Sequence, residues 1–140
     1  MKLNRPADNL RGKTGYPGAK VLLVINETSS LARHSNLLRE QGHEVLACDS
    51  FERGMELLGH ESFDLVAVSQ GNASFEGREL VTRALEKDRR IPVLVLTRLP
   101  DMKSYLEAMQ LGAVDYLEMP LTPAELVRVL RTHLRYPSAA

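Results

Sequence analysis

Residues 112–126 read GAVDYLEMPLTPAEL and place the end of one helix, a short strand and the start of another helix in a single stretch. Gly112 follows an apolar helical stripe, at the position where a helix that ends needs a left-handed residue. The run from Val114 to Leu117 has the length of a strand. Thr122 and Glu125 form a capping box around Pro123, whose missing N–H costs nothing at the first helical position. The stretch therefore predicts a helix–strand–helix unit.

Apolar runs of strand length precede this stretch and alternate with segments of helical periodicity. Such alternation is typical of βα units around a mostly parallel sheet. We expect each helix to bury its apolar stripe on the sheet, and Gly42, like Gly112, stands where a helix would end. The predicted strands are Val21 to Ile25, Glu44 to Cys48, Phe63 to Val68, Val93 to Thr97 and Val114 to Leu117. The apolar stripes after the second strand are Phe51, Met55 and Leu58; Leu80, Val81, Ala84 and Leu85; Met102, Tyr105, Leu106 and Met109; and Leu126, Val127, Leu130 and Leu134.

Length and composition fit one domain, because 140 residues with 44% hydrophobic content can bury one core but hardly two. Gly and Pro crowd the first residues among polar neighbours, which favours a flexible arm over packed structure. We therefore divide the chain into an N-terminal arm (1–19), a folded domain (20–135) and a short tail (136–140).

The charge balance and the single cysteine exclude several classes of function. Eighteen basic and eighteen acidic residues leave a formal net charge of zero, so no overall field draws the domain to nucleic acid or to a membrane surface. Cys48 alone cannot form an internal disulfide or a thiolate-rich metal site. The chain shows no signal peptide and no apolar run of membrane-spanning length, so we expect a cytoplasmic protein.

Side chains at the ends of four predicted strands would share one edge of the sheet. Ile25 and Asn26 stand at the end of the first run, Ser69 at the end of the third, Thr97 at the end of the fourth, and Met119 after the fifth. Open α/β sheets carry their sites at this carboxyl edge. These side chains are therefore the candidates for a functional site.

The same segments resemble the receiver domain of response regulators. Receiver domains read roughly KILIVDDE in the first strand, DLVLLDxxMPxxxG around the third, PVIxLTA in the fourth and GAxDYLxKPFxPEEL at the end. This chain supplies KVLLVINE, DLVAVSQGNASFEG, PVLVLTR and GAVDYLEMPLTPAEL. The interval from Ser69 to Gly77 matches the family without a gap, and the likeness extends from Lys20 to about Leu134. It implies a doubly wound, flavodoxin-like α/β fold with five parallel strands in the order 2-1-3-4-5.

The resemblance also implies a role for each strand end, and the residues here do not suit those roles. Ile25 and Asn26 replace an acidic pair that holds Mg²⁺, and they leave at most one neutral amide oxygen for a cation that prefers anionic ligands. Ser69 replaces the phosphorylated aspartate, and its hydroxyl cannot form an acyl phosphate. Met119 replaces a lysine that pairs with the phosphoryl group. We expect a degenerate receiver without Mg²⁺, without another cofactor and without enzyme activity.

Several other side chains are interpreted as structural or solvated residues without a role in a site. Thr97 and Tyr116 fall on the positions that move together when a phosphorylated receiver switches. From the residues alone we interpret Thr97 as a strand-end hydroxyl bonded locally and Tyr116 as an aromatic partly packed on the last strand. Glu27 is expected to be a solvated loop residue. Solvated or locally bonded surface positions are also expected for the four histidines, which show no metal-ligand spacing: His34, His43, His60 and His133.

The favoured hypothesis is a two-component signalling protein that acts as a phosphorylation-independent interaction module. Its partner is another protein or a second copy of the chain, and a homodimer would form through the last two helices and the last strand. The residues of this predicted face are Lys103, Asp115, Arg128 and Arg131. One alternative is a phosphorelay receiver with an unusual acceptor, for which Asp64 or Glu76 is the nearest carboxylate. The other is a module that senses a small neutral ligand at the strand ends.

Overall fold

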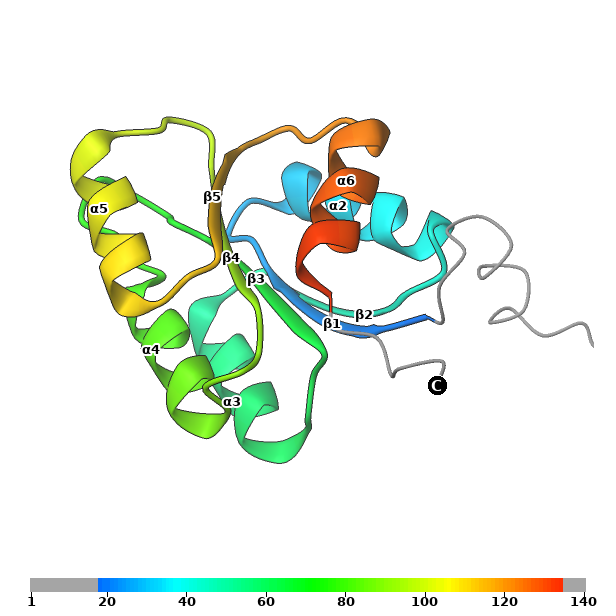
Figure 1. Ribbon diagram of the computed structural model, residues 1–140, viewed down its shortest axis with the longest axis horizontal. Coiled ribbons are helices and arrows are strands. Elements are labelled where there is room, and N and C mark those ends of the chain that lie inside the picture. Colours follow the sequence, from blue (N-terminus) through cyan, green and yellow to red (C-terminus); the bar gives the residue numbers. More distant parts are fainter. Residues whose placement is uncertain (1–17, 135–140) are drawn as a thin grey trace, which may run out of the picture.

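The computed structural model describes residues 18–134, and most of the predicted arm and tail lies outside the described residues. Strands and helices alternate along the chain, as the sequence predicts (Figure 1). The strands are β1 (Lys20–Val24), β2 (Glu44–Cys48), β3 (Leu65–Ser69), β4 (Val93–Thr97) and β5 (Asp115–Glu118). The helices are α2 (Thr28–Glu40), α3 (Phe51–His60), α4 (Arg78–Lys87), α5 (Met102–Leu111) and α6 (Pro123–His133).

The strands form one parallel sheet in the order β2-β1-β3-β4-β5, which confirms the predicted fold class. The central strands β1, β3 and β4 are almost continuously apolar, because a parallel sheet covered by helices buries both of its faces. The order reverses between β1 and β3, so the carboxyl ends of these strands flank the position where such sheets carry their sites.

Helices cover both faces of the sheet and create two hydrophobic cores. Figure 1 shows α2 and α6 on one side and α3, α4 and α5 on the other. Alternate residues of one strand enter different cores: Leu23 packs with Leu38 and Leu130 on the first side, and Leu22 packs with Leu80 on the second. The sheet therefore lies between two helical layers, as the doubly wound pattern requires.

The predicted helix boundaries follow from local chemistry. The capping box is present, with Thr122 Oγ1 accepting from the Glu125 amide over 3.1 Å and Glu125 Oε1 accepting from the Thr122 amide over 2.9 Å. Gly112 has a φ of 111° and Gly42 a φ of 103°, so both take the left-handed conformation that glycine adopts without a steric cost. Asp101 accepts from the Ser104 amide and caps the start of α5.

Three strands are shifted by one or two residues from their predicted bounds, while β2 and β4 agree with the prediction. A larger difference concerns α5, where the predicted buried stripe is wrong. Met102, Tyr105, Leu106 and Met109 are exposed, and α5 turns Ser104 and Ala108 toward the sheet instead. Small side chains let the helix lie close to the sheet and leave the larger apolar ones facing outward.

None of the helices in the described part of the chain is long and apolar enough to cross a membrane.

Candidate functional site at the carboxyl edge of the sheet

The structure brings together the five strand-end residues that the sequence singled out. Together they line one hollow of about 260 Å³ at the carboxyl edge of the sheet. Its lining residues are Ile25, Asn26, Glu27, Ser69, Gly71, Thr97, Arg98, Leu99 and Met119. This volume lies just below the roughly 300–1,000 Å³ usual for small-molecule pockets, so its size does not favour the ligand-sensing alternative.

Ser69 is buried, with 4% of its surface exposed, and its hydroxyl both donates and accepts a hydrogen bond within the protein. Its hydroxyl donates to Oδ1 of Asn26 over 3.0 Å, and the same oxygen accepts from the amide of Gly71 over 3.0 Å. No histidine or carboxylate accepts the hydroxyl proton in these contacts. The hydroxyl is therefore a structural hydrogen-bonding group, without the adjacent base that activates a nucleophilic serine.

A glycine shapes the loop beyond Ser69. The amide of Gly77 donates to the carbonyl of Gln70 over 3.1 Å, which brings the loop back against β3. A Cβ atom on Gly77 would lie 2.3 Å from the carbonyl oxygen of Ser69, closer than real Cβ contacts come. Position 77 therefore requires glycine for a steric reason.

The floor of the hollow is apolar and continuous with the core. Ile25 and Met119 are both buried and belong to the cluster that also contains Leu96 and Leu121. A bare carboxylate or ammonium group in such surroundings would need a partner to offset its desolvation. Apolar side chains at these two positions avoid that cost.

Charged groups border the hollow at its rim, and sequence reasoning missed the main one. Arg98 lies 3.1 Å from Glu27 and donates to Ser30 Oγ over 3.4 Å. A hydrogen bond from Ser29 lowers the pKa of Glu27, and Arg98 adds to this effect. Glu27 is an exposed loop residue, as expected, and it is also ion-paired with Arg98. The one sequence signal that could have identified Arg98 as a site residue is its position directly after Thr97, at the end of a predicted strand.

The side-chain oxygen atoms around the hollow do not match a magnesium site. Mg²⁺ takes octahedral hard oxygen ligands, usually with one or two carboxylates. Here Asn26 Oδ1 is engaged by Ser69, Glu27 is paired with Arg98, and the remaining carboxylate, Glu76, lies 3.5 Å from the Asn26 amide nitrogen. Among residues 18–134, no three His, Cys, Asp or Glu side chains come together as a metal-binding group.

The model of the response regulator receiver domain matches residues 21–131 of this sequence, which is most of the chain. The chain belongs to the response regulator receiver family. It is therefore a receiver domain of the two-component signalling type, and the family resemblance seen in its motifs is confirmed.

Curated relatives match this receiver domain over most of its length. It is 32% identical over 115 residues to the response regulator protein FleR of Pseudomonas aeruginosa, covering 82% of this chain and 24% of FleR. It is 31% identical over 140 residues to the two-component response regulator-like protein APRR1 of Arabidopsis thaliana, covering 96% of this chain and 22% of APRR1. The chain thus spans between about a fifth and a half of the length of the curated relatives it matches.

Solved structures support the same fold. A receiver domain from Clostridium thermocellum superimposes with a TM-score of 0.74 at 26% identity, over 82% of this chain and 93% of that one. A CheY-like receiver from Methanospirillum hungatei has a TM-score of 0.76 at 21% identity, over 82% and 92% of the two chains. The second likeness shows the fold alone.

The two predicted switch residues of this receiver have different surroundings. Thr97 Oγ1 accepts from the amide of Leu99 over 3.1 Å, so its hydroxyl is bonded locally, as interpreted from the sequence. Tyr116 is partly buried against α5, where its ring meets that of Tyr105 edge-on with 5.7 Å between centroids. Its hydroxyl donates to Gln70 Oε1 over 2.5 Å and accepts from the Asp101 amide over 3.2 Å.

The two carboxylates considered as alternative acceptors lie in different places. Asp64 precedes β3 at the opposite end of the sheet, where its Oδ2 accepts from the Lys20 amide over 2.8 Å. Glu76 lies near the rim of the hollow, beside Asn26. Only Glu76 is close enough to the strand ends to be tested as an acceptor.

The exposed large apolar side chains of residues 18–134 all lie in one segment, from the β4–α5 loop to the residue before β5. We call this surface the α5 face, and it consists of Leu99, Met102, Tyr105, Leu106, Met109 and Val114. Among the predicted interaction residues, Lys103, Arg128 and Arg131 are exposed, while Asp115 is half-buried and pairs with His133 over 3.2 Å.

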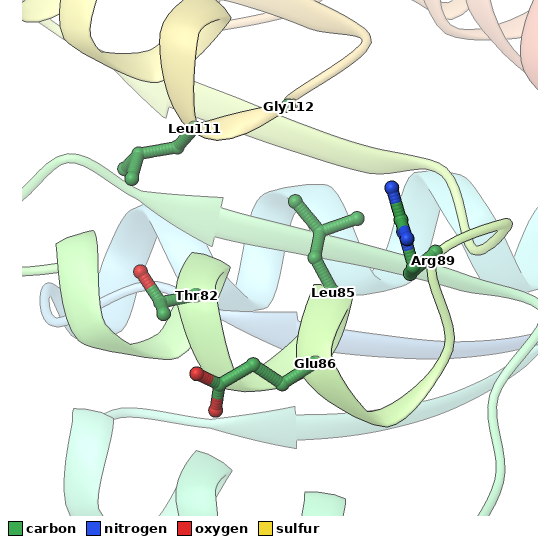
Figure 2. A pocket seen from close by; sticks show the side chains of 6 residues that line it. All are labelled: Thr82, Leu85, Glu86, Arg89, Leu111 and Gly112. Atoms are coloured by element: carbon green, nitrogen blue, oxygen red, sulfur yellow. The ribbon is translucent and has the colours of Figure 1, made fainter.

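A larger hollow of about 470 Å³ lies away from the strand ends, between α4 and the end of α5. Figure 2 shows Leu85 pointing from α4 toward the chain at Leu111 and Gly112, with Thr82, Glu86 and Arg89 around it. It contains none of the five strand-end residues, so it is separate from the receiver site.

Proposed function

We propose that this receiver domain signals through protein contacts that do not depend on phosphoryl transfer or on Mg²⁺. The observation that carries the proposal is the bond between Ser69 and Asn26, which occupies the groups that stand at the acceptor and metal positions. The apolar floor formed by Ile25 and Met119 offers no cation for a phosphoryl group. Opposite charges about 4 Å apart attract by roughly 4 kcal/mol at an effective dielectric of 20, so the lack of a lysine at position 119 weakens phosphoryl binding. The guanidinium that borders the hollow, Arg98, is already paired with Glu27.

Intact-mass measurement tests the proposal. The purified chain is incubated with Mg²⁺ and a small acyl-phosphate donor, beside a variant with four changes: Ile25→Asp, Asn26→Asp, Ser69→Asp and Met119→Lys. We expect no phosphoryl adduct on the chain and one on the variant, with circular dichroism checking that the variant is folded. A single adduct on the unmodified chain would overturn the proposal, and Glu76→Gln would then test the nearest acceptor.

The α5 face is the surface through which we propose that contacts form. Isolated apolar side chains are common on protein surfaces, but a contiguous apolar patch marks an interaction site. Leu99 is 81% exposed, Met102 69% and Leu106 50%. The edge strand is β5, and Figure 1 shows α5 on one side of the sheet and α6 on the other. Both helices adjoin β5, α6 through the contact between His133 and Asp115.

The proposed occupant of the α5 face is a second copy of the chain. Lys103 and the two α6 arginines, Arg128 and Arg131, bring positive charge to the two helices that adjoin β5, while Asp115 and Glu118 on β5 bring negative charge. A two-fold axis places the same surface on both sides, so a face that carries both signs can complement itself. The mixed charge around an apolar centre is what a symmetric dimer needs.

A further inference from the structure

We propose that Gln70 is a positioning residue that holds α5 and its exposed apolar side chains in place through a closed triangle of hydrogen bonds with Tyr116 and Asp101. The inference rests on the proposed role of the α5 face and names the internal contacts that fix this face.

The three residues close a ring of contacts between separate elements, in which Asp101 takes part through its side chain and its backbone amide. Gln70 Oε1 accepts from the Tyr116 hydroxyl over 2.5 Å, and that hydroxyl accepts from the Asp101 amide over 3.2 Å. Gln70 Nε2 completes the ring by donating to Asp101 Oδ2 over 3.2 Å. The triangle therefore joins the end of β3, the edge strand β5 and the residue that caps α5.

The donors and acceptors admit one orientation of the Gln70 amide. Its nitrogen also donates to the carbonyl of Asn72 over 3.0 Å, so both N–H groups meet acceptors. The reversed amide would turn its oxygen toward the Asp101 carboxylate and the Asn72 carbonyl, where no proton is available. The amide of Ser104 lowers the pKa of Asp101, and Gln70 contributes in the same direction, so Asp101 remains an acceptor.

Gln70 is well placed to hold this geometry, because its own position is fixed. Only 3% of its surface is exposed. Its backbone amide donates to the Leu96 carbonyl over 2.7 Å, and its backbone carbonyl accepts from the Gly77 amide over 3.1 Å. A buried polar network of this kind gains strength when every member is satisfied and becomes costly when one is lost.

The triangle borders the α5 face directly. Asp101 lies between Leu99 and Met102 in the sequence, and the ring of Tyr116 carries Tyr105 against its edge. Loss of the triangle would leave the start of α5 with the Asp101 cap to the Ser104 amide and the packing of Ser104 and Ala108 on the sheet, but without its hydrogen bonds to β3 and β5. The exposed apolar side chains around Asp101 would then be held less rigidly.

Amide hydrogen exchange measured by NMR tests this role. Gln70→Leu replaces the side-chain amide with methyl groups and removes the bonds to both Tyr116 and Asp101. Although Gln70 does not touch the Asp101 amide, we expect its exchange to become about tenfold faster, since losing about 1.4 kcal/mol of coupled hydrogen bonding is a tenfold change. Unchanged exchange at Asp101 would overturn the proposal.

A rescue variant and a control separate positioning from general destabilisation. The double variant Gln70→Glu with Asp101→Asn exchanges donor and acceptor in the contact between positions 70 and 101, because the new carboxylate can accept both from the Tyr116 hydroxyl and from the new side-chain amide. It does not replace the bond from Gln70 Nε2 to the Asn72 carbonyl. We expect slow exchange of the backbone amide at position 101 to return in part, so that it is clearly slower than in Gln70→Leu. Ser50→Ala removes the cap that accepts from the Arg53 amide on α3, over 3.2 Å. It should lower stability without changing exchange at Asp101. Failure of the rescue, or equal acceleration by Ser50→Ala, would overturn the proposal.

Sedimentation of the same proteins distinguishes this inference from the proposed function. Gln70→Leu should weaken self-association several-fold, and the rescue variant should restore part of it. If the unmodified chain does not self-associate while exchange at Asp101 responds as expected, the positioning role of Gln70 is supported and a second copy is the wrong occupant of the α5 face. If self-association occurs and ignores Gln70→Leu, the positioning role is wrong.

Discussion

The hydroxyl of Ser69 donates to Asn26 Oδ1 over 3.0 Å, so the residues at the acceptor position and at one acidic position of a receiver satisfy each other. The two groups complement each other as neutral partners, one donating and one accepting. The bond also ties the end of β3 to the loop after β1. The neutral side chains that replace the charged residues of a receiver site therefore also form a hydrogen bond with each other.

A double-mutant cycle measures this bond. Ser69→Ala, Asn26→Ala and the double variant are unfolded with urea, and we expect a coupling free energy of about 0.5–1.5 kcal/mol, the usual net value of a hydrogen bond. Ser69→Ala alone should cost more than Asn26→Ala, because it also removes the acceptor of the Gly71 amide. Strictly additive effects would show that the two residues do not stabilise each other.

The turn after Ser69 requires glycine, and a second glycine provides a matched comparison. Gly77→Ala would place Cβ 2.3 Å from the Ser69 carbonyl oxygen, a backbone atom that cannot easily move. We expect a loss of about 1–3 kcal/mol or more in the free energy of unfolding, as for overpacked sites. Gly59→Ala in α3 meets nothing within 4 Å and should stabilise by roughly 0.5–1 kcal/mol. Equal effects at the two positions would contradict the steric argument.

His34 is a buried histidine that makes two hydrogen bonds, which corrects the expected surface position; His43 is buried as well. Nδ1 of His34 lies 2.7 Å from the Ser30 carbonyl, and Nε2 lies 3.1 Å from the Leu121 amide. One neutral tautomer satisfies both contacts, because Nδ1 donates and Nε2 accepts. Burial lowers the pKa of His34, and the charges of Arg33 and Arg98 lower it further.

The stability of the protein should therefore fall with pH below about 6.5, the usual histidine pKa. Above that value both the folded and unfolded chains hold His34 neutral. Below it the unfolded chain binds the proton first, so stability declines until the lowered folded pKa is reached. The slope is at most about 1.4 kcal/mol per pH unit for each such histidine, and His43, whose pKa burial also lowers, adds its own part.

Urea unfolding at pH 7.5 and pH 5.5 checks this expectation against a matched variant. His34→Gln can donate to Ser30 and accept from Leu121 but does not titrate, so its stability should fall less than that of the unmodified chain. Carboxylate effects are common to both proteins and cancel in the difference. Parallel losses in the two proteins would show that His34 does not bind its proton as argued.

The fold was predictable because its signals are local. Apolar runs, the glycines Gly42 and Gly112 and the capping box at Thr122 each act through neighbouring residues, and strand bounds differ by only one or two positions. The orientation of α5 was not predictable in this way. Its large apolar side chains have helical spacing whether they face the sheet or the solvent, and only tertiary packing shows that Ala108 faces inward.

The candidate site was predictable at the strand ends but not beyond them. Ser69 and Thr97 end their strands, which places them at one edge by topology. The role of Gln70 depends on Asp101 and Tyr116, which are 31 and 46 residues away in the sequence. Contacts between such distant residues leave no local pattern, and a buried glutamine after a strand has no motif of its own.

The last prediction concerns self-association through the α5 face. Leu106 is 50% exposed, so Leu106→Lys should change the stability of the monomer by no more than about 0.5 kcal/mol. At the centre of a dimer contact the same change buries an unpaired charge, and we expect at least about a tenfold weaker association by sedimentation equilibrium. Ala32→Lys, at an exposed position of α2, introduces the same charge away from α5 and should leave association unchanged. Equal weakening by both variants would point to net charge, whereas a monomeric unmodified chain would mean that a different protein occupies this face.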